Sequence, residues 1–235
     1  MGFRCSLKIK RQEKPGAAPY WQTFSSEAGG EATVAAALRE INDRTPLTDL
    51  DGGRAMPISW ECACLQRKCG ACAMRVNGAP RLACSAFLSE FPGGEIVLEP
   101  LGKFPVISDL TVDRSVIFER MKQARLWLEE KAYLSGRRHE VSYQSARCLM
   151  CGCCLEVCPN FGAAEDFGGA LLSVNAYRTL EQSSGGGHKK EMSEAYRKLY
   201  FSGCGGSLAC HQICPLELPV EELLLRSNAV AVWGR

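Results

Sequence analysis

The stretch RCLMCGCCLEVCPN, residues 147–160, places five cysteines within eleven positions and closes them with a proline. Such a density of thiols has three common explanations: a disulfide framework, a zinc site or iron–sulfur ligation. Disulfides are the weakest of the three, because the N-terminal residues MGFRCSLKIK alternate apolar and polar side chains and show no secretory signal. A chain that stays in a reducing compartment would use clustered thiols to bind metal.

The spacing within this stretch distinguishes between the two metals. It reads C-x2-C-x2-C-x3-C-P, formed by Cys148, Cys151, Cys154, Cys158 and Pro159. Bacterial ferredoxins have this spacing, and their fourth cysteine serves a second cluster. A partner run is therefore required downstream, and CGGSLACHQICP, residues 204–215, supplies one with the spacing C-x5-C-x3-C-P. When the two runs are aligned at their Cys–Pro ends, the second run matches the first except that Ser207 stands in place of the second cysteine.

Exchange of the fourth ligands assigns the cysteines of both runs. We expect a 4Fe–4S cluster on four thiolates: Cys148, Cys151, Cys154 and Cys214. We expect a 3Fe–4S cluster on three thiolates, with Ser207 at the vacant corner: Cys158, Cys204 and Cys210. Two other arrangements stay open, ligation of iron by the Ser207 oxygen and a four-iron cluster with water at that corner. Cys153 is left without a ligand role, and each proline is expected to begin the helix that follows it.

An earlier group, CACLQRKCGACAMRVNGAPRLAC at residues 62–84, has the spacing C-x4-C-x2-C followed by a distant cysteine. This is the plant-type pattern for a 2Fe–2S cluster. The expected ligands are Cys64, Cys69, Cys72 and Cys84. A four-cysteine zinc site is the alternative, and it is disfavoured because structural zinc sites prefer two C-x2-C pairs. Cys62 and Cys5 are spare, and Cys62 is expected to be packed rather than to bind metal.

The dipeptide Asn77-Gly78 explains how the distant cysteine joins its group. Asn-Gly predicts a two-residue hairpin turn, and the register of that hairpin pairs Cys72 with Ala83. Cys84 then lies next to Cys72. Pro80 indicates that its arm of the hairpin is an edge or irregular strand.

The remaining sequence predicts an α+β chain of two domains, residues 1–106 and 107–235, with the boundary near residues 104–110. In the first domain, alternation predicts a strand at 3–10 paired with 20–24, a helix at 34–41 and a strand at 95–100. The second domain reads as helical. Its expected helices are 113–130, capped by Asp113, and then 168–181, 189–200 and 217–228, with 183–190 as a flexible, solvated loop.

Composition excludes several classes of function. The chain has 235 residues, 46% of them hydrophobic and 23% charged, with a formal net charge of +2, so it is an ordinary globular protein and not a nucleic-acid binder. No apolar run approaches the roughly 20 residues of a membrane-spanning helix. The three histidines, His139, His188 and His211, form no catalytic constellation, and His211 is expected to be a helix residue rather than an iron ligand.

In this order, the three cysteine groups closely resemble the iron–sulfur subunit of succinate dehydrogenase and fumarate reductase, along essentially the whole chain. The stretches that carry the resemblance are APYWQTF, CGACAM, RLACSAF, KFPVISDLTVDRS, CGCCLEVCPN and the last Cys–Pro group. The resemblance implies a plant-type ferredoxin-like β-grasp domain with the 2Fe–2S cluster, followed by an all-α ferredoxin-like domain with the 4Fe–4S and 3Fe–4S clusters. It also implies a relay of single electrons, with no catalytic residue in this chain.

The same resemblance implies the partners. These are a flavoprotein subunit with covalent FAD, where the succinate chemistry takes place, and one or two membrane-anchor subunits with haem b and a quinone site. The expected location is peripheral, on the cytoplasmic side of the bacterial cell membrane. Many family members have Trp residues after the first Cys–Pro and a His after the first cysteine of the last group. Here PNFGAAEDF (159–167) and Gly205 stand instead, which favours the menaquinone-using forms.

Two other functions remain as alternatives. The chain could be the iron–sulfur subunit of a soluble, thiol-linked fumarate reductase or a related flavoenzyme; the lack of a long extension beyond Arg235 is expected to weigh against this. The other alternative belongs to a non-redox class, a zinc-stabilised scaffold or interaction module.

Overall fold

The computed structural model describes residues 5–132 and 139–234, so Phe3, predicted to belong to the first strand, lies outside the described residues. The chain divides into two compact units, Met1–Asp113 and Arg114–Arg235. The elements of the first unit are β1 (Cys5–Arg11), β2 (Tyr20–Ser26), α1 (Val34–Asn42), β3 (Ala73–Val76), β4 (Ala79–Leu82), η1 (Ala83–Ser85), η2 (Leu88–Glu90), β5 (Glu95–Glu99), β6 (Val106–Ser108) and β7 (Thr111–Val112). Those of the second are α2 (Ser115–Gln123), α3 (His139–Ala146), α4 (Cys153–Glu156), α5 (Gly169–Gln182), α6 (Gly186–Leu199), η4 (Phe201–Gly203), α7 (Ala209–Gln212) and α8 (Val220–Ala231).

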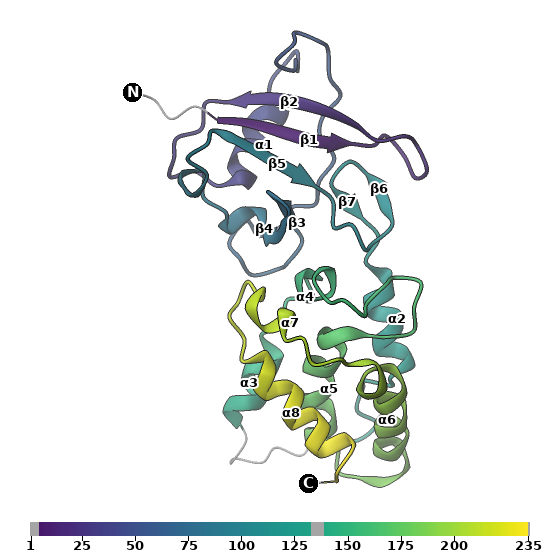
Figure 1. Cartoon of the computed structure of the whole chain (residues 1–235). Coiled ribbons are helices and arrows are strands. Elements are labelled where there is room, and N and C mark those ends of the chain that lie inside the picture. The colour runs from purple at the N-terminus through teal and green to yellow at the C-terminus, as the bar shows by residue number, and fades with distance from the viewer. Residues whose placement is uncertain (1–4, 133–138, 235) are drawn as a thin grey trace. The chain divides into compact units, whose positions relative to one another are not determined.

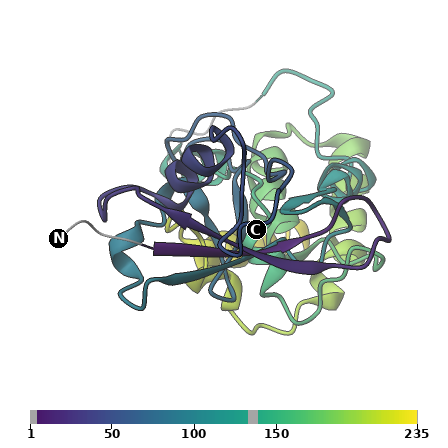
Figure 2. The ribbon, with the colours of Figure 1, turned by 90° about the horizontal axis from the view of Figure 1, so that it is seen from above.

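The first unit is built on a mixed five-stranded sheet with the strand order β2-β1-β5-β3-β4. β1 pairs antiparallel with β2 and parallel with β5, and α1 covers one face of the sheet (Figures 1 and 2). The predicted alternation of β1 is confirmed, since Leu7 and Ile9 are fully buried while Lys8 and Lys10 are not. This is the β-grasp fold expected from the sequence, and its α+β character is confirmed.

The hairpin of β3 and β4 has the predicted register. Ala73 pairs with Leu82 and Val76 with Ala79, around an Asn77-Gly78 turn in which both residues have positive φ. Continuing the ladder, the Ala83 N–H donates to the Cys72 carbonyl at 3.0 Å. Pro80 lies on β4, the edge strand of the sheet, as its missing N–H requires.

A buried ion pair attaches the β6–β7 hairpin to the first unit. Arg11, at the end of β1, lies 3.0 Å from an oxygen of Asp109 in the β6–β7 turn, and both side chains are 4% exposed. The Asp109 carboxylate also accepts the backbone N–H groups of Gln12 and Ser59. These contacts hold the hairpin to the first unit, which extends to Asp113.

The second unit packs its helices around α5, which is buried along most of its length and contacts α2, α3, α4, α6 and α8 (Figure 1). A helix that is buried on nearly every side occupies the centre of a bundle. The largest side chains of this core are Tyr177, Tyr196 and Tyr200, each at most 1% exposed. The helices predicted at 168–181 and 217–228 correspond to α5 and α8.

Several predictions for the second unit were wrong. α2 ends at Gln123 instead of continuing to 130, and its N-cap position is Arg114 and not Asp113. Most of the loop expected at 183–190 belongs to α6, which begins at Gly186. No long helix begins at either Cys–Pro proline; α4 and α7 precede the prolines, and α5 and α8 start several residues later. α3 and the β6–β7 hairpin were not predicted.

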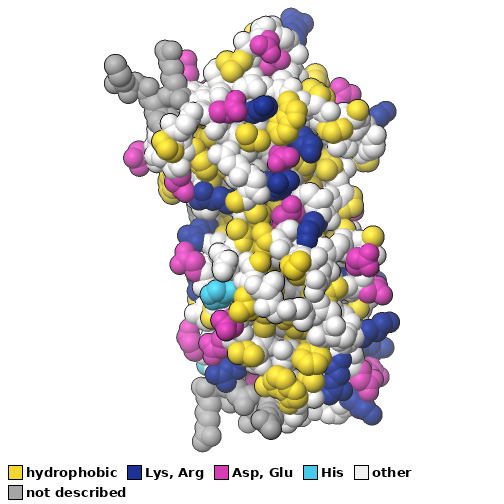
Figure 3. Space-filling view, viewed as in Figure 1, with side chains coloured by type: hydrophobic (Ala, Val, Ile, Leu, Met, Phe, Trp, Pro, Cys, Tyr) yellow, Lys and Arg dark blue, Asp and Glu magenta, His cyan; other side chains and the backbone are white. Residues whose placement is uncertain are grey.

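Charged side chains of both signs are interspersed over the face shown in Figure 3, and no basic patch dominates it. This distribution agrees with the small net charge of +2.

Candidate metal centres

The loop before β3 turns its backbone N–H groups toward cysteine sulfurs. Gln66 and Lys68 each donate to Cys64 Sγ at 3.3 Å, and Arg67 donates to Cys84 Sγ at 3.3 Å. Leu65, Arg67 and Gly70 adopt positive φ, which is how a short loop can curl around the sulfurs. Hydrogen bonds of this kind stabilise thiolate ligands of iron–sulfur clusters.

The four thiols of this first group differ in their environment. The Gln66 and Lys68 N–H groups lower the pKa of Cys64 to about 7. Burial, with Cys84 alongside, raises the pKa of Cys72 to about 12. Metal binding ionises buried thiols, so a metal at this group would replace the Cys72 proton. The structure brings together all four residues predicted for the 2Fe–2S cluster: Cys64, Cys69, Cys72 and Cys84.

The second group lies where α4, α5 and α7 approach one another. Burial raises the pKa of Cys148, and the neighbouring Cys151 and Cys214 raise it further. Burial also raises the pKa of Cys154 well above its ordinary value, with Cys151, Cys148, Cys210 and Cys214 close by. Each of these effects requires proximity, so the four predicted 4Fe–4S ligands lie together although 66 positions separate Cys148 from Cys214.

Arg114 was not anticipated from the sequence. Its Nη1 donates to the Cys151 carbonyl at 3.2 Å. A hydrogen bond from Cys153, together with the positive charge of Arg114, lowers the pKa of Cys151 to about 7. A cation beside a ligand cysteine compensates part of the negative charge that four thiolates bring to a cluster. No spacing rule identifies such a residue, because it comes from the start of α2.

The third group lines a cavity. The cavity is partly open to solvent, and its walls include Cys158, Cys204, Cys210 and Ser207. Burial raises the pKa of Cys210, with Cys158 and then Cys204 close by. The structure therefore brings together the three thiols predicted for the 3Fe–4S cluster and puts Ser207 on the same cavity wall.

The two Cys–Pro runs have equivalent backbones. Met150 and Gly152 of the first run have φ values of 53° and 89°, and the aligned Gly206 and Leu208 have 70° and 56°. The short helices that follow, α4 and α7, begin and end at aligned positions and have the same C-cap conformation. Ser207 therefore occupies the backbone position that Cys151 occupies in the first run.

A single zinc ion fits these groups poorly. At a Zn–S distance of about 2.3 Å, four thiolates must converge within about 4 Å of one another. Within residues 5–132 and 139–234, no three His, Cys, Asp or Glu side chains are placed to hold one metal ion. All fourteen cysteines are free thiols, which also excludes the disulfide framework from this structure.

The three cysteines for which the sequence predicts no ligand role differ in their exposure to solvent. Cys5 and Cys153 are buried, but Cys62 is exposed, so the expectation that Cys62 is packed was wrong. His211 lies in α7 as predicted, and it is exposed.

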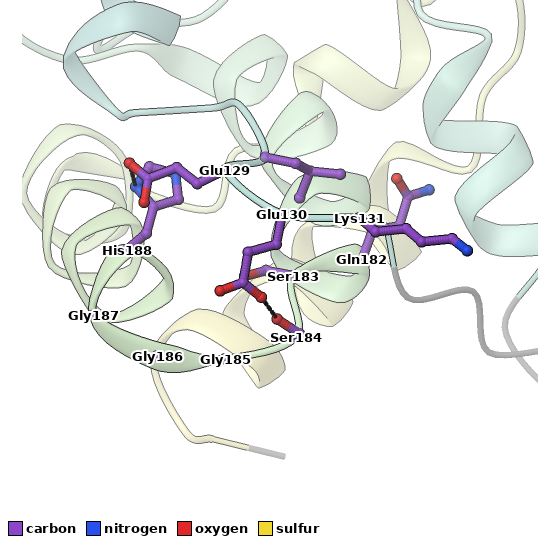
Figure 4. Close-up of a pocket in the computed structure, with 11 residues that line it drawn as sticks. Glu129, Glu130, Lys131, Gln182, Ser183, Ser184, Gly185, Gly186, Gly187 and His188 are labelled. Carbon is purple, nitrogen blue, oxygen red and sulfur yellow. Dashed lines mark hydrogen bonds and ion pairs between the residues drawn. The ribbon is translucent and has the colours of Figure 1, made fainter.

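A second pocket of about 390 Å³ contains no cysteine (Figure 4). Its polar side chains bind one another: Glu130 accepts the Ser184 hydroxyl, and His188 contacts the Trp127 carbonyl at 2.9 Å and Glu129 at 3.3 Å. These contacts join the segment after α2 to the start of α6, which indicates a structural role.

The fold and these thiol groups define an iron–sulfur protein with a β-grasp domain and a helical ferredoxin-like domain. Residues 6–119 match the family model described as 2Fe-2S iron-sulfur cluster binding domain, and residues 144–218 match 4Fe-4S dicluster domain. The chain is 33% identical to the succinate dehydrogenase iron-sulfur subunit of Bacillus subtilis, over 94% of this chain and 89% of that one. It belongs to the family of succinate dehydrogenase and fumarate reductase iron–sulfur subunits.

Other similar proteins also point to this family or to its fold. The fumarate reductase iron-sulfur subunit of Wolinella succinogenes is 28% identical over 99% of this chain and 100% of its own. Among solved structures, a chain of the Mycobacterium smegmatis Sdh1 complex in the apo form matches with a TM-score of 0.81 and 19% identity, covering 100% of this chain and 98% of that one; at this identity the match supports the fold. In the part of the chain that the structure describes, no helix has the length and apolar character to cross a membrane.

Proposed function

We propose that this chain relays single electrons within a succinate:quinone oxidoreductase, between FAD in a flavoprotein subunit and quinone at a membrane anchor. Family membership supports this role. The observation that carries the proposal is the sorting of eleven of the fourteen cysteines into three separate groups. When bound, iron–sulfur clusters accept and release one electron at a time.

The proposed ligands are those that the spacing predicts. Residues 1–106 would hold the 2Fe–2S cluster on Cys64, Cys69, Cys72 and Cys84. Residues 107–235 would hold the 4Fe–4S cluster on Cys148, Cys151, Cys154 and Cys214, and the 3Fe–4S cluster on Cys158, Cys204 and Cys210. The cavity lined by the last three thiols supports the third assignment, and the backbone equivalence of Ser207 and Cys151 supports a missing fourth ligand.

The residues of this chain perform three tasks in such a relay. Their thiolates fix the clusters, their backbone N–H groups stabilise the sulfur ligands, and buried side chains exclude water from the ligands. The 3Fe–4S position is assigned nearest the quinone, because cluster type and net charge set the reduction potential over a wide range. Oxidation of succinate or reduction of fumarate takes place in the flavoprotein subunit.

The finer points rest on the family resemblance. We assign haem b to the anchor and menaquinone as the quinone, because the Trp residues and the His common near a quinone site are replaced here by residues 159–167 and Gly205. The complex would lie peripherally on the cytoplasmic side of the bacterial cell membrane.

The test is spectroscopic and uses the intact complex purified without oxygen. Low-temperature EPR should show an oxidised 3Fe–4S signal and, after reduction by succinate, a 2Fe–2S signal. Metal analysis should give about nine iron atoms per chain. A zinc-loaded, colourless protein would refute the proposal. A purified complex with FAD but no membrane anchor would instead favour the soluble fumarate reductase.

A further inference from the structure

A buried tyrosine points its hydroxyl at one of the proposed ligands. Tyr200 directly follows α6, is 1% exposed, and donates its O–H to Cys204 Sγ at 3.3 Å. The ring of Phe167 stacks against it with a centroid distance of 5.9 Å. Both aromatic residues also line the cavity of the third cysteine group, so the phenol is held in place beside the sulfur.

The chemistry of the two groups decides the direction of this hydrogen bond. A tyrosine, with an ordinary pKa of about 10, carries its hydroxyl proton at physiological pH. A thiolate sulfur can only accept, so the hydroxyl acts as donor whenever Cys204 is bound to metal.

A second tyrosine, one helical turn earlier, supplies the comparison. Tyr196 is also fully buried, and its ring lies 5.1 Å from that of Tyr200. Its hydroxyl, however, donates to Asn228 Oδ1 at 2.7 Å and contacts Ser173 Oγ at 2.8 Å. The two phenols are similarly buried, but of the two it is the Tyr200 hydroxyl that is hydrogen-bonded to the ligand sulfur.

We propose that Tyr200 is a positioning residue for Cys204 and that its hydrogen bond raises the reduction potential of the cluster on Cys158, Cys204 and Cys210. The inference rests on the proposed function of this site. A donor to a thiolate withdraws electron density from the sulfur, which stabilises the reduced state because that state carries the extra negative charge. A higher potential makes this position a better final acceptor in the chain.

The experiment is an EPR-monitored redox titration of the intact complex, comparing wild type with Tyr200→Phe and with Tyr196→Phe as the matched control. Tyr200→Phe should shift the midpoint potential of the three-iron signal downward and leave the other two clusters unchanged. Tyr196→Phe should move none of the three. An unchanged three-iron potential in Tyr200→Phe, or an equal shift in both variants, would overturn the proposal.

A second variant covers the case in which Tyr200→Phe fails to assemble. Site-specific incorporation of 3,5-difluorotyrosine at position 200 keeps the ring and the hydroxyl but makes the phenol a stronger donor. The potential should then shift upward, and no shift or a downward one would refute the role. If the wild-type complex shows no three-iron signal, the cluster assignment fails together with this inference; if the signal is present but insensitive to position 200, only the inference fails.

Discussion

Replacement of Asp109 by alanine tests the contact that holds the last hairpin of the first unit. Asp109 is 3% exposed, lies in the β6–β7 turn with a φ of 45°, and binds three partners. Its oxygens accept the N–H groups of Gln12 at 2.9 Å and Ser59 at 2.8 Å, and one of them lies 3.0 Å from Arg11 Nε. The substitution therefore leaves a buried guanidinium without its counter-charge.

Loss of one partner from a buried ion pair costs about 3–5 kcal/mol. Arg11 keeps its bonds to Gln22 and to the carbonyls of Met56 and Pro57, so part of its charge stays solvated by protein dipoles. The two N–H groups that lose an acceptor add to the cost, and about 3 kcal/mol is therefore a lower bound. For a unit of roughly 110 residues this corresponds to a fall in Tm of at least about 10 °C.

The assay is differential scanning calorimetry of the full chain, with Ile107→Ala as the control. Ile107 lies on the same hairpin but is 46% exposed, so its truncation should change the free energy of unfolding by about 0.5 kcal/mol or less. If Asp109→Ala lowers the Tm no more than the control does, the ion pair does not hold the hairpin, and the reasoning is refuted.

Three further changes have definite expected outcomes. Ser207→Cys should complete the ligand set, so that the oxidised three-iron EPR signal disappears and the iron content rises from about nine to about ten atoms per chain; persistence of the signal would contradict the equivalence with Cys151. Leu208→Gly relieves a φ of 56° but removes a half-buried side chain that packs against the core of the second unit, so a thermal melt should show a net loss of stability, and a gain would show that the strain outweighs the packing. Burial acts to raise the pKa of Glu40, but hydrogen bonds from Arg44 and Ser26 hold that pKa below its ordinary value of 4.5. The ionised Glu40 side chain therefore stabilises the fold above pH 4.5, and this contribution is lost as the pH falls through the lower folded-state pKa. Melts of Glu40→Gln should differ from wild type at pH 7 and converge with it in acid, and a constant difference would contradict this sign.

The predictions that succeeded depend on short-range chemistry. An Asn-Gly pair favours a turn with two residues at positive φ, and that turn alone sets the register that puts Cys84 beside Cys72. The alternation of β1 likewise follows from one buried face. The cysteine spacings are local signals too, because each loop is expected to pass around an iron–sulfur cluster of fixed size.

The errors occurred where tertiary contacts override the local pattern. The apolar spacing of 113–130 continues past Gln123, but Arg125 adopts a φ of 55°, which ends the helix and leaves Ala124 buried in the core. The opposite error occurred at glycines 185–187, which were predicted to belong to a flexible loop. α6 starts among them because the following turns bury Met192 and Tyr196. Neither Arg114 nor Tyr200 has a sequence signal, since each reaches its cysteine through packing.

The third cysteine loop shows that its shape does not depend on a complete set of ligands. Its backbone has positive φ at the same two aligned positions as the first Cys–Pro run and is followed by an aligned short helix, although Ser207 replaces a cysteine and Leu208 takes the left-handed conformation that Gly152 adopts at no cost. A leucine there costs about 1–2 kcal/mol, so the surrounding packing must impose the conformation. If packing determines the backbone conformation of the loop, then the side chain at position 207 and the hydrogen-bond donors around the sulfurs can vary without changing that conformation. One fold can in this way hold clusters of different potential at equivalent sites, and an electron relay requires such a difference.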